Sequence, residues 1–194
     1  MTRNGFFKKI MSASAVAALF VAAPSARAEM PEFNTIELQA LSTVAPLNLI
    51  NWKVGDTMSY NLSMLFGKGS MVKTVSKEEG NGVWLHQDIS IMGQKQTADV
   101  LFDRADGKIL KMLQNGKEVQ IPDDKIEVIS QDYAEITVPA GKFQSVHIVA
   151  KSQKISKIEM WANPTQTAID GALKQIMATQ FGDMTLELTS FKRN

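Results

Sequence analysis

A period of two in the apolar side chains is the feature that most constrains the fold of this chain. In residues 58–64 large apolar side chains alternate with small polar ones, which places the two kinds on opposite faces of an extended strand. The same alternation recurs in residues 83–91, 97–102, 146–150 and 184–189. Turn signals such as Asp-Gly and Asn-Gly separate these runs and favour hairpins. The sequence therefore predicts about ten consecutive antiparallel strands with one apolar face.

A sheet of so many short strands with one apolar face has to curl, close on itself or fold into two layers. We expect a mainly β protein with a strongly curved antiparallel sheet or an incompletely closed β-barrel. A short helix is expected at about residues 167–173, after the break at Asn163-Pro164. A β-sandwich is the alternative architecture.

The first residues have the pattern of a secretory signal peptide. Arg3, Lys8 and Lys9 precede an apolar stretch over residues 10–23, and Ala26-Arg27-Ala28 supplies a small-x-small cleavage site. The predicted organisation is a signal peptide over 1–28, a lead-in segment over 29–53 and a single antiparallel β domain over 54–194.

Removing the leader changes the charge of the protein. The whole chain of 194 residues has 21 basic and 20 acidic groups, and the leader holds four of the basic ones, so 17 basic and 20 acidic groups remain, a formal charge of −3. A mildly acidic chain has no electrostatic reason to bind nucleic acid or an anionic membrane surface.

The chain contains no cysteine, which excludes cysteine nucleophiles, iron-sulfur clusters and thiolate zinc sites. A bacterial lipoprotein carries its lipid on a cysteine directly after the cleavage site, and Glu29 occupies that position here. We therefore expect a soluble exported protein without a stable membrane anchor. The periplasm is the favoured compartment, and an extracellular location is the alternative.

Few residues suggest chemistry. His86 and His147 are the two histidines, and each falls on the less apolar face of a predicted strand. Asp88 shares a strand face with His86, but this pair lacks the third protein ligand that a zinc site usually needs. No hydrolase, phosphate-binding or dinucleotide-binding motif is present. We expect no catalytic residues, no metal site and no cofactor.

The apolar face itself is the better candidate for a binding site. Nine methionines follow residue 28, and methionine lets a surface adapt to different apolar ligands. A curved sheet could enclose an acyl chain between such side chains, whereas an ordinary packed core is the alternative. The candidate ligand-binding residues are Met58, Tyr60, Leu62, Met64, Phe102 and Met184.

Three short sequence motifs occur in order along the chain: Trp-Lys-Val-Gly-Asp at 52–56, Ile-Thr-Val-Pro-Ala-Gly-Lys-Phe at 136–143 and Glu-Met-Trp-Ala-Asn-Pro at 159–164. With them the chain resembles uncharacterised bacterial envelope proteins that have a curved, barrel-like sheet. It is distantly similar to the periplasmic lipoprotein-carrier superfamily. The resemblance covers most of residues 52–191 and consists of turns and strands, so it implies a fold and transfers no functional residue.

These observations lead to one preferred function and two alternatives. The preferred function is a soluble periplasmic binding module for an apolar or lipid-like ligand, without enzymatic activity. The first alternative is a structural or interaction subunit of the envelope, with a packed barrel that docks on a partner protein. The second is an envelope hydrolase.

Overall fold

The computed structural model describes residues 50–65, 67–121, 126–153, 155–179 and 182–194. The predicted signal peptide and residues 29–49 of the lead-in segment lie outside these ranges. The described part of the chain forms eleven strands. They are β1 (Thr57–Met64), β2 (Gly67–Glu79), β3 (Gly82–Ile91), β4 (Gln94–Asp103), β5 (Ile109–Gln114), β6 (Lys117–Glu118), β7 (Glu127–Val138), β8 (Gly141–Lys151), β9 (Ile158–Ala162), β10 (Ala172–Thr179) and β11 (Gly182–Lys192).

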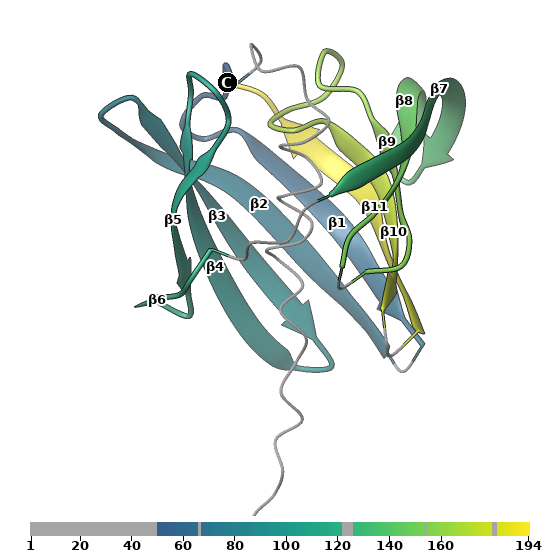
Figure 1. The fold of residues 1–194 in the computed structure, drawn as a ribbon, viewed down its shortest axis with the longest axis horizontal. Coiled ribbons are helices and arrows are strands. Elements are labelled where there is room, and N and C mark those ends of the chain that lie inside the picture. Colours follow the sequence, from purple (N-terminus) through teal and green to yellow (C-terminus); the bar gives the residue numbers. More distant parts are fainter. Residues whose placement is uncertain (1–49, 66, 122–125, 154, 180–181) are drawn as a thin grey trace, which may run out of the picture. The chain divides into compact units, whose positions relative to one another are not determined.

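All these strands belong to one antiparallel sheet, in the order β6-β5-β4-β3-β2-β1-β11-β10-β9-β8-β7. Strands that are consecutive in the chain are neighbours in the sheet, and β1 also pairs with β11 (Figure 1). The exception is β6 and β7, which follow each other in the chain but form the two opposite edges. Hydrogen bonds therefore do not close the sheet. The expected curved or incompletely closed antiparallel sheet is confirmed, and one continuous sheet replaces the two layers of the sandwich alternative.

The alternation in the sequence decides which face of the sheet is buried. In β1, Met58, Tyr60 and Leu62 are at most 3% exposed, whereas Asn61 and Ser63 face solvent. Burial of each large apolar side chain contributes about 1.5–3 kcal/mol, which fixes the strand in this register. We call the face that carries Met58, Tyr60 and Leu62 the inner face and the opposite one the outer face.

A segment before β1 covers one end of the inner face. Trp52 is 8% exposed, and its ring lies edge-on to Phe102 of β4, with 5.3 Å between the ring centroids. Arg104 donates hydrogen bonds to the carbonyl oxygens of Ile50 and Trp52 at 2.9 Å each. The segment over residues 50–56 is thus held at the end of β4 by both packing and hydrogen bonds.

The short helix expected at residues 167–173 is wrong. The side-chain oxygen of Asn163 accepts hydrogen bonds from the backbone N–H of Thr165 and Gln166 at 3.1 and 3.0 Å, which starts a turn. The turn stops at Gly171, whose φ is +75°, and β10 follows directly. A single turn gains too few hydrogen bonds to propagate as a helix, so the pairing of β10 with its neighbours decides the conformation.

Within the described ranges, no helix has the length and apolar character needed to cross a membrane.

Candidate functional site

The structure buries five of the six residues that the sequence proposes as ligand contacts. Met58, Tyr60, Leu62 and Met184 are at most 3% exposed and lie on the two central strands β1 and β11. Phe102 is 3% exposed at the end of β4, under Trp52. The sixth residue, Met64, is half-buried at the last position of β1.

A buried ion pair lies among these apolar side chains. Lys73 of β2 is fully buried, and its Nζ lies 2.7 Å from Oδ2 of Asp170, whose side chain is 4% exposed. The same Nζ is 5.3 Å from the centroid of the Tyr60 ring. The Tyr60 hydroxyl donates a hydrogen bond to the carbonyl oxygen of Ala172 at 3.1 Å. Removal of either partner would leave the other charge buried without compensation, which is strongly destabilising.

The loop between β9 and β10 carries Asp170 to the inner face. Ile169 is buried and has a φ of +49°, a left-handed conformation that costs energy for a β-branched residue. Asp170 then accepts a second hydrogen bond, from the backbone N–H of Ala172 at 3.0 Å. A Cβ at Gly171 would come within 2.2 Å of the backbone nitrogen of Pro164, so only glycine fits there. The loop is therefore shaped to present the Asp170 carboxylate to Lys73.

In the described part of the chain, two glutamines on the inner face have side-chain amides without a hydrogen-bond partner. Gln87 is fully buried in β3 and Gln175 is 1% exposed in β10. In the structure as described, neither the oxygen nor the nitrogen of either amide makes a hydrogen bond. Gln87 lies opposite Lys73 and Ala98 in the sheet register. A buried polar group left in this state costs about 1–3 kcal/mol, and native proteins contain few of them.

The period of two in the sequence also indicates where these polar residues lie. Lys73 has the phase of Met71 and Val75, and Gln87 has the phase of Leu85 and Ile89. A polar residue in the apolar phase of a strand points to the buried side. The period of two could therefore have placed Lys73 and Gln87 on the inner face.

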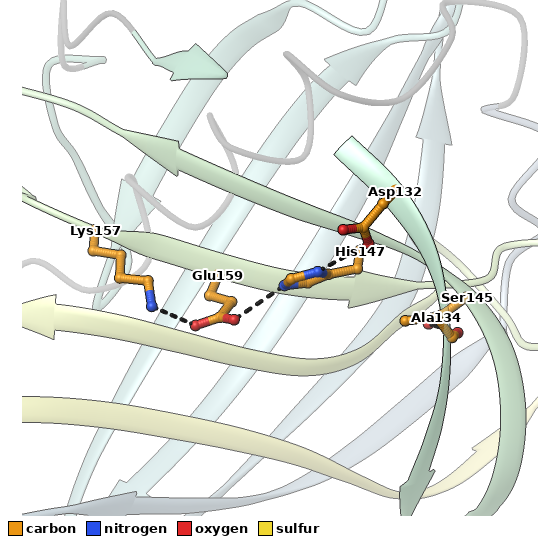
Figure 2. A network of polar contacts seen from close by, with 6 residues as sticks. All are labelled: Asp132, Ala134, Ser145, His147, Lys157 and Glu159. Carbon is orange, nitrogen blue, oxygen red and sulfur yellow. Dashed lines mark hydrogen bonds and ion pairs between the residues drawn. The ribbon is translucent and has the colours of Figure 1, made fainter. Parts of the chain in front are cut away.

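The outer face carries a separate network around His147 of β8 (Figure 2). Its Nδ1 lies 3.1 Å from Oδ1 of Asp132 on β7, and its Nε2 lies 3.0 Å from Oε1 of Glu159 on β9. The ring stacks on Trp161 with 4.4 Å between centroids. A hydrogen bond from Lys157 lowers the pKa of Glu159, burial opposes this shift, and the hydrogen bond from His147 adds to the lowering. The network ties the edge strand β7 to two strands further into the sheet.

Ser145 lies near this network but does not complete a catalytic arrangement with it. Its hydroxyl donates to the carbonyl oxygen of Ala134 at 2.7 Å (Figure 2). Both ring nitrogens of His147 face carboxylates, so neither is directed at a hydroxyl that it could activate. This geometry gives no support to the hydrolase alternative.

Both ring nitrogens of His86 on β3 also face carboxylates, as those of His147 do. Its Nδ1 lies 2.7 Å from Oδ1 of Asp99, and its Nε2 lies 3.3 Å from Oδ2 of Asp88. The two nitrogens point away from each other, so the two carboxylates lie on opposite sides of the ring. Across the described ranges, no group of three or more histidine, aspartate or glutamate side chains is arranged to hold a metal ion.

We expect the contribution of His86 to stability to depend on pH. Burial lowers the pKa of His86, but the hydrogen bond to Asp99 and the charges of Asp99 and Asp88 outweigh it, so the pKa is raised above 6.5. The protonated ring therefore stabilises the fold fully below about pH 6.5, and this contribution is lost as the pH rises through the folded-state pKa. Urea unfolding of the wild type and His86→Gln at a series of pH values should show a difference that shrinks over this window. A difference that is independent of pH would contradict the expectation.

No protein-family model matches the sequence, and no curated protein matches it. Solved structures with a similar backbone include the hypothetical protein CT021 from Chlamydia trachomatis, with a TM-score of 0.50, 9% identity and coverage of 80% of this chain and 92% of that one. A Bacteroides fragilis protein with a YmcC-like fold has a TM-score of 0.46, 13% identity and coverage of 73% and 97%. MucB has a TM-score of 0.40, 8% identity and coverage of 82% of this chain and 58% of its own. At this level of identity the match to CT021 shows a shared fold alone.

Proposed function

We propose that this protein is an exported, non-enzymatic binding module that holds an apolar or lipid-like ligand against the inner face of its sheet. The observation that carries the proposal is the pair of buried, unpartnered glutamines, Gln87 and Gln175. The predicted signal peptide supports export, with the periplasm as the favoured compartment. The resemblance of the sequence to the lipoprotein-carrier superfamily is in keeping with the proposal.

The glutamines are difficult to account for in a core that serves stability alone. An apolar residue of similar volume at either position would remove the desolvation cost and pack equally well. A ligand with a polar group would instead supply the missing hydrogen bonds. Polar side chains at such positions are typical of ligand pockets, which combine an apolar lining with a few polar groups that orient the ligand.

The methionines support the same proposal. Six of them are at most 3% exposed and lie on strands from both halves of the sheet. They are Met58, Met71, Met112, Met160, Met177 and Met184. Methionine has a flexible and polarisable side chain, so a face that is rich in it can repack around chains of different shape.

Diphenylhexatriene, a fluorescent hydrocarbon without polar groups, tests the proposal. The full chain, expressed with its own leader and purified from the host periplasm, should be stripped of lipid in organic solvent and refolded. We expect saturable, one-to-one enhancement of the probe's fluorescence, and the enhancement should fall when Met58 and Met184 are replaced by the larger residue tryptophan. Absence of saturable binding by the folded wild type would overturn the proposal.

Exposed apolar side chains at two hairpin ends suggest how a ligand is taken up. Leu65 and Met92, next to the ends of β1 and β3, are each 70% exposed, and Met92 packs against Gly67. We expect the double variant Leu65→Ser/Met92→Ser to take diphenylhexatriene from phosphatidylcholine vesicles several-fold more slowly, because less apolar surface contacts the bilayer. Stopped-flow fluorescence measures the rate. The control Leu110→Ser, at another exposed position, should leave it unchanged. Equal slowing in both variants would contradict a role for the hairpin ends.

The edge strand β7 favours a second candidate function, docking on another envelope protein by strand addition. Among the described strands, β7 pairs with β8 alone, and it exposes Ile129 and Tyr133, the latter by 86%. A long exposed edge is a template for pairing with another chain. A photocrosslinking residue at Tyr133 should then yield a discrete adduct in cells, whereas the same residue at Leu110 should not. Identical results at both positions would count against docking at this edge.

A further inference from the structure

The charges on the inner face restrict which ligand it can accept. Among the described residues, Lys73 is the only lysine or arginine that is buried. Its Nζ is already paired with Oδ2 of Asp170 at 2.7 Å, and both side chains are at most 4% exposed. The pair is neutral as a whole, so the described part of the inner face offers no unbalanced positive charge to a ligand.

An anionic ligand group would therefore be buried without a counter-charge. A carboxylate or phosphate placed beside Asp170 would also be repelled by it, and burying an unpaired charge costs far more than burying a neutral polar group. Among the described residues, the buried side-chain polar atoms without a hydrogen-bond partner belong to the amides of Gln87 and Gln175, which are neutral. Each amide can donate two hydrogen bonds and accept two.

The two amides lie at different places on the inner face, because they do not belong to the same row of residues that lie opposite one another across neighbouring strands. Gln87 lies opposite Lys73, in the row that also contains Met58. Gln175 lies between Leu186 of β11 and Met160 of β9. Gln175 thus lies between two apolar side chains, whereas Gln87 lies between Ala98 and the Lys73 that is paired with Asp170. Both positions suit a neutral hydrogen-bonding group within or at the end of an aliphatic chain.

We infer that the ligand is a neutral acyl amphiphile, a fatty ester or fatty amide, and that the site rejects the corresponding free fatty acid; this inference rests on the proposed function. An ester or amide carbonyl accepts a hydrogen bond from the Nε2 of a glutamine, and the N–H of an amide donates to its Oε1. Both bonds satisfy atoms that are now unpartnered. The Lys73–Asp170 pair stays intact and excludes the ionised acid.

Competition against diphenylhexatriene tests the inference with three ligands of one chain length: laurate, methyl laurate and lauramide, at a pH where laurate is ionised. We expect methyl laurate and lauramide to bind the refolded full chain at least about tenfold more tightly than laurate. Gln87→Met/Gln175→Met should bind the ester and the amide about tenfold more weakly and still bind the hydrocarbon probe. The matched control Gln120→Met changes an exposed glutamine and should behave as the wild type.

The outcomes separate the two proposals. If the probe does not bind, the proposed function fails and the ligand class fails with it. If the probe binds but laurate competes as well as methyl laurate, the inference of a neutral ligand is overturned and the proposed function stands. Unchanged ester and amide affinity in the double variant would also overturn the inference. A near-UV circular dichroism spectrum that matches the wild type shows that the double variant is folded.

Discussion

Replacing Asp170 with alanine is expected to lower the free energy of unfolding by about 3–5 kcal/mol, because the substitution leaves the ammonium group of Lys73 buried without a counter-charge. Lys73 is fully buried, and its Nζ lies 2.7 Å from the Asp170 carboxylate. The substitution also removes the hydrogen bond from the Ala172 N–H to Oδ1 of Asp170. A loss of this size is a large part of the total stability of a domain.

Urea unfolding measures the effect, and two variants control for its cause. Adding Lys73→Met to Asp170→Ala should restore most of the lost stability, because an apolar replacement of a whole buried pair is often neutral. Glu187→Ala breaks a comparable pair, in which Lys174 Nζ is 2.8 Å from the carboxylate and both side chains are about one-third exposed or less. That change should cost only about 1 kcal/mol. If Asp170→Ala costs no more than Glu187→Ala, the ion pair does not hold the inner face.

Replacing Gln87 and Gln175 with methionine is expected to stabilise the ligand-free protein, by about 1–3 kcal/mol for each substitution. Each methionine matches the length of the glutamine and removes two buried polar atoms that have no hydrogen-bond partner. The same change removes the groups that would contact a ligand. Higher stability together with weaker binding is the expected relation at a site where function and stability compete.

Thermal and urea unfolding of the delipidated protein test this expectation. The control Gln120→Met should change the stability by less than about 0.5 kcal/mol, since residue 120 is exposed. Destabilisation by either inner-face substitution would mean that the glutamine is satisfied in the folded protein. That result would contradict a ligand site on the inner face.

The strands follow from the sequence because a single physical rule governs them. Burial of one face imposes a period of two, and residues such as Met58, Tyr60 and Leu62 follow it without exception. The order of strands is also simple, since hairpins connect most neighbours. The pairing of β1 with β11 has no local signal, because it joins segments more than 100 residues apart through backbone hydrogen bonds.

The site was harder to predict because it depends on contacts across the sheet. Met58 and Met184 could be assigned to the inner face, but the partner of Lys73 lies 97 residues away in a loop. The sequence predicts a helix for that loop, but the course of the loop depends on the turn at Asn163 and the left-handed conformation of Gly171. Sequence periodicity indicates which side of a strand is buried. It does not indicate which distant segment covers that side.

Nuclear magnetic resonance of the side-chain amides of Gln87 and Gln175 tests the central claim most directly. Their signals can be assigned from their loss in the two methionine variants, and the delipidated protein can then be titrated with methyl laurate. We expect both pairs of amide signals to shift in parallel with displacement of diphenylhexatriene, while the signals of the exposed Gln120 stay in place. Displacement of the probe with no change in the signals of Gln87 and Gln175 would contradict this expectation.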